Sequence, residues 1–178
     1  MRPSAVTNEA FLDVRRDAAA TMPERPALEA FLEDYRTAVV TTTSGLSEHN
    51  ARHRLVPSAT TIAGLVKHLR VIEMNWFQRI LGDVCKPDLP LAINWNDYAH
   101  SSFTLEPGDT LGHLLAGYQQ QCELSRQIAA RHDLSDTADH PALGRVSLRW
   151  IYLHMIDETA RHVGHADILR EQLDAATR

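Results

Sequence analysis

A carboxylate and an imidazole near the end of the chain are the residues best suited to chemistry. Glu158 and His162 lie four residues apart in the segment VSLRWIYLHMIDETARHVGHADILREQL. On a helix, this spacing places two side chains one above the other on the same face. A carboxylate oxygen and an imidazole nitrogen in that arrangement can share one divalent metal ion. The same spacing also suits a plain hydrogen bond on a helix surface. The choice between these two interpretations depends on whether the pair lies on the buried or the solvated side of the helix.

The apolar residues of this segment place the pair on the side that faces the core. At about 100° per residue, one sector about 60° wide holds Glu158 and His162 together with five apolar side chains. These five are Leu148, Ile151, Met155, Leu169 and Leu173. An unpartnered carboxylate is costly in an apolar core. The position of the pair therefore strengthens the case for a metal site, with a hydrogen bond between the two side chains as the alternative.

A third metal ligand is expected from a neighbouring helix, and His68 is the best candidate because it flanks the apolar stripe of its own segment. His165 follows His162 by three residues and is either a reserve ligand or a group that orients His162. His154 also lies at the edge of the stripe, and His113 is a weaker candidate. The other five histidines lie in predicted loops or near helix ends, where a solvated role is the simplest interpretation; they are His49, His53, His100, His132 and His140.

Helices must position these residues, since no convincing alternating strand pattern is found. Apolar stripes predict long helices from about Pro26 to Gly45, from about Ser58 to Gly82, from Asp109 through Ala129, and from about Val146 to Leu173. Ser58 and Asp109 are the candidate caps of the two middle helices. A weaker helix is expected over about residues 8–20, and the stretch 83–108, which contains three prolines, is predicted to be a loop.

These four amphipathic helices predict an all-α fold, a four-helix bundle. The long loop would serve as a crossover between the second and third bundle helices, and we expect an up-up-down-down order. Residues 1–22 would form an N-terminal extension or short helix, and residues 23–178 would form the bundle domain.

Composition excludes several classes of protein. The 178-residue chain has a formal net charge of -5 and no basic block, which argues against a nucleic-acid partner. No apolar run approaches the roughly 20 residues of a membrane span. The only cysteines, Cys85 and Cys122, are too few for a disulfide scaffold and favour a reducing cytoplasm. We interpret them as a loop residue and a core residue, respectively, rather than as nucleophiles.

Further apolar residues lie opposite or beside the core stripe of the second helix. They are Val66, Val71, Met74 and Phe77. Apolar residues on an outer face can mediate self-association, so a homodimer is expected, although isolated surface apolar residues are also common.

Two segments of the chain resemble a known family. The segments GLVKHLRVIEMNWF and SLRWIYLHMIDETARHVGHADILRE resemble the DinB-like superfamily, in particular a branch that is abundant in actinobacteria. The resemblance extends from about Pro23 to Leu173. It implies a four-helix bundle and a divalent metal held by His68, Glu158 and His162. Glu158 replaces the histidine of the commonest pattern, and the resulting set is similar to the His–Glu–His set of mycothiol-dependent maleylpyruvate isomerase.

Three protein ligands would leave one coordination position open, as catalytic zinc sites do. Zinc is expected, and the oxygen ligand would also admit nickel, manganese or iron. The open position would take either a water molecule or a low-molecular-weight thiol, and the resemblance favours a thiol-dependent transferase or isomerase that acts on small electrophiles. Arg149, Arg161 and Lys67 are candidate cations for binding an anionic thiol. A metal-dependent hydrolase, a non-catalytic stress-response or binding module with a structural metal closed by His165, and a storage protein remain as alternatives.

Overall fold

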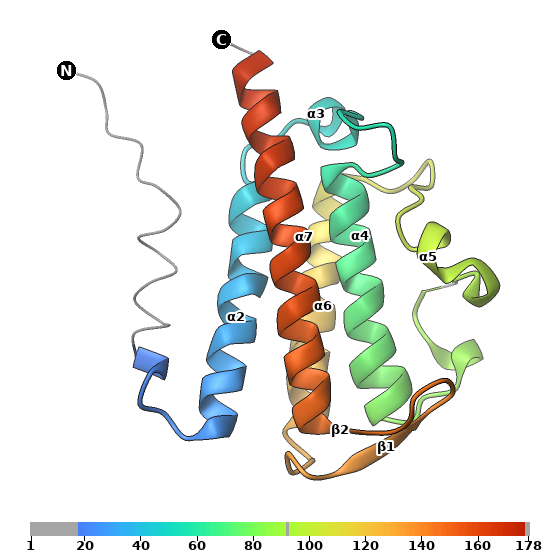
Figure 1. Ribbon diagram of the computed structural model, residues 1–178. Coiled ribbons are helices and arrows are strands. Elements are labelled where there is room, and N and C mark those ends of the chain that lie inside the picture. The colour runs from blue at the N-terminus through green and yellow to red at the C-terminus, as the bar shows by residue number, and fades with distance from the viewer. Residues whose placement is uncertain (1–17, 92, 177–178) are drawn as a thin grey trace.

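Four long helical segments dominate the structure, a computed structural model that describes residues 18–91 and 93–176 (Figure 1). They are α2 (Glu24–Thr43), α4 (Ile62–Glu73) with its π-helical continuation η1 (Met74–Leu81), α6 (Leu111–Ala129) and α7 (Leu148–Ala176). The prediction of a mostly helical fold is confirmed, and a small two-stranded sheet accompanies the helices. The predicted N-terminal extension, residues 1–22, lies largely outside the described residues.

The helix directions differ from the predicted order. Helices α2 and α7 run one way, whereas α4 and α6 run the other way (Figure 1). The up-up-down-down prediction is therefore wrong, and the order is up, down, down, up. The chain reverses after α2 at one end of the helices, through the short helix α3 (Glu48–Arg52), whose Ala51 joins the same apolar cluster as Ala63 at the start of α4. The predicted crossover then returns the chain along the helices, so α6 runs parallel to α4.

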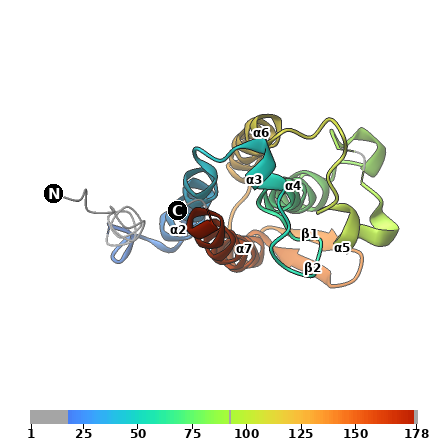
Figure 2. The ribbon, with the colours of Figure 1, turned by 90° about the horizontal axis from the view of Figure 1, so that it is seen from above.

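The packing order follows from these directions. Helix α7 contacts both α2 and α4, while α6 contacts α4 and η1, so the four segments surround a shared interior (Figure 2). Three short helical segments interrupt the crossover: η2 (Lys86–Asp88), η3 (Trp95–Asp97) and α5 (Tyr98–Ser101). The crossover is therefore a partly ordered layer beside α4 rather than the plain loop that was predicted.

An antiparallel hairpin that the sequence analysis did not predict connects α6 to α7. It comprises β1 (Thr137–His140) and β2 (Gly144–Ser147), with Thr137 opposite Ser147. Gly144 adopts a φ of 74°, a backbone conformation that glycine tolerates best. The strands have only four residues each, which is too short for their alternation to stand out in the sequence. The hairpin lies at the end of the helices where η1 ends (Figure 1).

The two middle helices begin one to three residues later than predicted. The Thr61 hydroxyl accepts a hydrogen bond from the backbone N–H of Gly64 at 3.0 Å, and Thr110 caps α6 in the same way. Ser58 and Asp109 are therefore not the caps. Serine, aspartate and threonine can all cap a helix, and the caps are the residues with extended backbone directly before each first turn.

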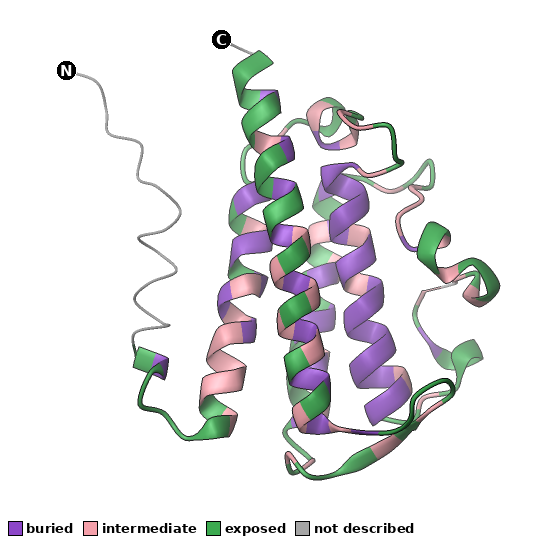
Figure 3. Ribbon diagram, in the orientation of Figure 1, coloured by how far each residue is buried: buried purple, intermediate pink, exposed green. Residues whose placement is uncertain are grey.

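Helix α4 is buried on nearly all sides, whereas α7 exposes one side along its length (Figure 3). Val66, Val71, Met74 and Phe77 are all at most 1% exposed. The homodimer expectation depended on these residues lying on an outer face, and that placement is wrong. Val71 and Met74 pack with Leu89 of the crossover, which covers the side of α4 that would otherwise face solvent.

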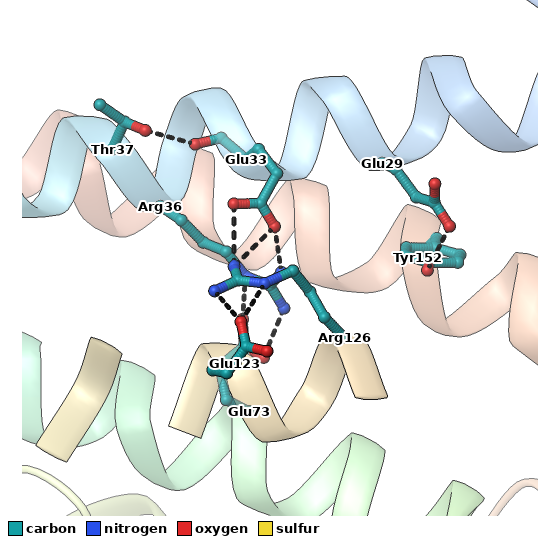
Figure 4. Close-up of polar contacts among 8 residues, drawn as sticks. All are labelled: Glu29, Glu33, Arg36, Thr37, Glu73, Glu123, Arg126 and Tyr152. Carbon is teal, nitrogen blue, oxygen red and sulfur yellow. Dashed lines mark hydrogen bonds and ion pairs between the residues drawn. The ribbon is translucent and has the colours of Figure 1, made fainter. Parts of the chain in front are cut away.

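A buried ion pair joins α2 to α4 (Figure 4). Arg36 donates through Nε and Nη2 to the two carboxylate oxygens of Glu73, at 2.8 and 2.7 Å. Arg36 also donates to Glu33, which accepts from Arg126 of α6 as well. The network thus ties three of the four long helices together.

None of the helices in the described part of the chain has the length and hydropathy of a membrane-spanning segment.

Candidate metal centre

The structure brings the three predicted ligands together on two neighbouring helices. His68 lies on α4, and Glu158 and His162 lie one turn apart on α7. The Nε2 atoms of His68 and His162 lie 3.1 and 3.2 Å from the same carboxylate oxygen, Oε1 of Glu158. One ligand atom from each residue falls within 4.8 Å of the other two.

Burial of the apolar stripe on α7 directs this cluster inward. Met155 and Leu169, one turn before and two turns after the pair, are 0% and 4% exposed, as the periodicity predicts for a core face. The side chains of His68, Glu158 and His162 are 6%, 14% and 11% exposed. The cluster therefore lies at the border between the core and a solvent-connected space.

The crossover fixes the ring of His68 from two sides. The Nδ1 atom of His68 lies 2.9 Å from the hydroxyl oxygen of Ser102, which is fully buried. The ring of Phe103 stacks on the imidazole with centroids 4.0 Å apart. Gly64 allows this approach, because a Cβ atom there would lie 2.9 Å from the carbonyl oxygen of Phe103. These contacts leave Nε2 of His68 directed at Glu158.

The electrostatics of the cluster suit a cation. Hydrogen bonds from His162 and His68 hold the pKa of Glu158 well below its usual range, so this carboxylate is charged at neutral pH. Burial lowers the pKa of His68 and outweighs the opposing hydrogen bond to Glu158, so His68 is neutral. Arg161 approaches the other oxygen of Glu158 only to 3.8 Å, and it is 56% exposed and bonded to Asp157. The carboxylate charge is thus only weakly compensated by the protein.

The remaining histidines on α7 do not join the cluster. The Nδ1 atom of the exposed His165 lies 3.4 Å from Nδ1 of His162, whereas Glu158 lies at Nε2 of that ring. His165 is therefore placed to orient His162 and not to provide a fourth ligand. His154 stacks on Trp150 with centroids 5.1 Å apart. Four more of the histidines considered in the sequence, His49, His53, His100 and His113, are exposed and lie outside the cluster.

A cavity of about 590 Å³ opens beside the cluster. This size is typical of small-molecule sites. Its walls come from α4, η1, the crossover, the hairpin and α7. The lining residues are His68, Ile72, Asn75, Trp76, Arg79, Lys86, Trp95, Tyr98, Ala99, Phe103, His140, Pro141, His154, Glu158 and His162. An open coordination position on a bound metal would therefore face a space large enough for a small molecule.

The family model of the mycothiol S-transferases matches residues 27–175, a range that covers nearly all of the four long helices and the whole cluster. The chain belongs to this family. Because the family is DinB-like, the resemblance stated from the sequence is confirmed. No curated protein matches the chain.

This member of the mycothiol S-transferase family draws its cavity cations from positions that the sequence analysis missed. Arg79 and Lys86 line the cavity, whereas the three cations considered earlier do not. Those three pair elsewhere: Arg149 with Glu24, Lys67 with Asp109, and Arg161 with Asp157. Lys86 lies in the segment predicted to be a plain loop, which explains why its role was not recognised.

His140 is a second residue of this cavity that was misjudged. Its ring stacks on Trp76 with centroids 5.0 Å apart, and burial lowers its pKa. The solvated role expected for His140 is therefore wrong. Only the hairpin brings this residue to the cavity, and no signal in the sequence predicted the hairpin. Cys85 is exposed and Cys122 is buried, as expected for a loop and a core residue.

Proposed function

We propose that the chain is a metal- and mycothiol-dependent transferase that joins the thiol sulfur to a small electrophile. The observation that carries this proposal is the convergence of two imidazole nitrogens and a carboxylate oxygen beside a cavity, in a chain that belongs to the mycothiol S-transferase family. In this proposal residues 23–178 act as a single four-helix bundle domain in the cytoplasm.

The residues present fit a divalent metal. Neutral imidazole and carboxylate are the ligand types that zinc binds in catalytic sites, where three protein ligands leave a fourth position open. Zinc is our proposed ion, and the same set also accommodates nickel, manganese or iron. Ser102 supports the fit, since its hydroxyl can accept the Nδ1–H of His68 while Nε2 binds the metal.

When bound, the metal supplies a Lewis acid that lowers the pKa of a ligated thiol. Phe103 and Ser102 hold His68 in place, and Glu158 contributes the negative charge that retains the cation. His154 lines the cavity, and burial lowers its pKa, so its neutral imidazole can accept the thiol proton. The sulfur then forms a bond to the electrophilic carbon as the bond to a leaving group breaks and that group departs with the electron pair. With an epoxide the ring C–O bond breaks instead, and with an activated alkene the C=C π bond breaks; in both, the oxygen or the adjacent carbon takes the proton held by His154.

The proposal is tested by the consumption of thiol. Zinc-loaded protein is incubated with mycothiol and, in turn, an alkyl halide, an epoxide and an activated alkene, and the remaining free thiol is measured. We expect loss of thiol above the uncatalysed rate with at least one electrophile. His162→Ala should reduce the rate to the uncatalysed level, and the exposed His113→Ala should retain the wild-type rate.

Two results would contradict the transferase. Thiol consumption at only the uncatalysed rate with every electrophile would remove the proposed reaction. Ester hydrolysis that requires His162 but no thiol would instead identify a metal-dependent hydrolase, because the same open position can activate a water molecule.

A further inference from the structure

The part of the cavity formed by η1 and the crossover holds two cations without a fixed counter-charge. Arg79 and Lys86 both line the cavity, and neither has a carboxylate within ion-pair distance among the described residues. Other cations of the fold pair with acids, as Arg36 does with Glu73 and Lys67 with Asp109. Two unpaired cations beside one cavity indicate that the missing negative charge belongs to a ligand.

The position of Arg79 supports this interpretation. Its Nε donates to Asn75 at 2.6 Å, and no hydrogen bond from its other two nitrogens is found within the described ranges. Burial raises the pKa of Tyr98 on the crossover and lowers the pKa of His140 on the hairpin, and the charge of Arg79 opposes the first shift and adds to the second. The guanidinium therefore acts on two different walls of the cavity, with its two outer N–H groups left for a planar acceptor such as a carboxylate.

Trp95 contacts both cations and a further hydrogen-bond donor, Tyr98. Arg79 and Lys86 lie 5.0 and 5.2 Å from the centroid of its ring, within the range of cation–π contacts. Tyr98 stacks on the same ring with centroids 5.5 Å apart. The hydroxyl of Tyr98 is buried and has no hydrogen-bond partner in the described part of the chain. A buried polar group without a partner is uncommon, and an oxygen of a bound anion would satisfy it.

Flat rings form another part of the cavity wall. Trp76 stacks with His140 at an interplanar angle of 12°, and it also contacts His154 with centroids 4.6 Å apart. Aromatic faces of this kind favour a planar ligand body through stacking. The cavity therefore combines a flat apolar wall, two cations and an unsatisfied donor.

We propose that Arg79, Lys86 and Tyr98 form a subsite for a small planar carboxylate, whose flat body packs on Trp76. As the binding place of the electrophile, this subsite rests on the proposed function. The binding itself does not, because none of the four residues belongs to the metal cluster.

Binding of benzoate to the full chain tests the subsite. The indole N–H signals of Trp76 and Trp95 are followed by NMR during titration, once with chelator and once with zinc. Benzamide, a neutral analogue, and cyclohexanecarboxylate, an anion without a flat face, serve as comparisons. We expect benzoate to shift both indole signals with and without zinc, and to bind at least about tenfold more tightly than either analogue.

Variants assign the binding to the cations. Arg79→Gln and Lys86→Gln should each weaken benzoate binding by about tenfold, which is typical of one charged contact. Lys86 is exposed, so its replacement leaves folding intact even if that of Arg79 does not. Arg131→Gln removes an equal charge from an exposed position outside the cavity and should leave binding unchanged.

Three results would overturn the subsite. The first is an absence of shifts in both indole signals. The second is equal binding of benzamide. The third is binding that requires zinc and ignores Lys86→Gln, which would place the anion on the metal and leave the proposed function intact. Conversely, if benzoate binds as expected but no thiol transfer is found, the proposed subsite is upheld and the proposed transferase function is refuted.

Discussion

Glu73 and Glu158 are both carboxylates withdrawn from solvent, yet the fold compensates them in different ways. Glu73 is fully buried and receives two short hydrogen bonds from the guanidinium of Arg36 (Figure 4). Glu158 retains slight exposure and accepts from two imidazoles, at 3.1 and 3.2 Å. The first carboxylate has a cation within the protein, whereas the second has two ligand nitrogens that converge on the same oxygen.

The charges of the two regions differ accordingly. Burial alone would lower the pKa of Arg36, but the charge and hydrogen bonds of Glu73, together with the charge of Glu33, hold that pKa well above its ordinary value. Burial lowers the pKa of His68 and is only partly opposed by Glu158. The Arg36–Glu73 pair is thus complete without a ligand and serves the fold. The cluster around Glu158 has an excess of negative charge that a divalent cation would balance.

The largest effect is expected from breaking the compensated pair. Glu73→Ala leaves the Arg36 guanidinium buried without its main partner, and a loss of about 3–5 kcal/mol in the free energy of unfolding is expected. Urea denaturation of chelator-treated protein measures this loss. Glu123→Ala removes the exposed partner of Arg126 in the same network and should cost less than about 1 kcal/mol. Similar losses for the two variants would contradict the structural role assigned to Glu73.

A smaller effect is expected at the hydrogen bond that orients His68. Ser102→Ala removes the partner of Nδ1, and metal affinity should fall by about 10- to 100-fold, as is typical when a supporting group of a metal ligand is lost. Competition with a chelating dye measures the affinity. Ser101→Ala changes a neighbouring serine that bonds to the backbone of Asn94 instead, and it should bind metal as the wild type does. A weakening confined to Ser101→Ala would refute the orientation of His68 by Ser102.

The stability of the metal-free protein should respond little to the uncompensated carboxylate. Glu158→Ala loses two hydrogen bonds but also removes the cost of withdrawing a charge from water. We expect the free energy of unfolding in the presence of chelator to change by no more than about 1 kcal/mol. If urea denaturation instead gives a loss as large as that of Glu73→Ala, Glu158 is a structural residue.

Mild acid should affect the cavity side and spare the ion pair. Burial lowers the pKa of His154. Between pH 7 and 5 the imidazole of His154 therefore becomes protonated in the unfolded chain but stays largely neutral in the folded chain. Stability therefore falls as the pH decreases through this window. Unfolding of chelator-treated protein at several pH values should show this loss, and His154→Gln should reduce it. The exposed His113→Gln should keep the wild-type slope; an unchanged slope in His154→Gln would contradict the burial effect.

The sequence predicts those parts of the site that depend on a single helix. The periodicity of α7 alone places Glu158 and His162 with Met155 on the inner face, and His68 is recognisable from its place beside the stripe of α4. In each case the relation between residues is local, so helical geometry determines it. The long helices are predicted for the same reason.

Relations between distant segments could not be predicted in this way. Ser102 and Phe103 reach His68 only because the crossover packs against α4 at Gly64, and His140 reaches the cavity only through the hairpin. The partner of Glu73 depends on how α2 meets α4, which periodicity does not determine. The crossover was placed correctly, but the helix directions were mispredicted because the short connection through α3 reverses the chain between α2 and α4.

Metal content tests the central claim most directly. Wild-type protein, Glu158→Ala, His162→Ala and His165→Ala are treated with chelator, dialysed against zinc, freed of excess ion and analysed for bound metal. We expect about one divalent ion per chain in the wild type and in His165→Ala, and almost none in Glu158→Ala and His162→Ala. Full occupancy in both of the latter variants, or a wild type that retains no ion, would contradict the account.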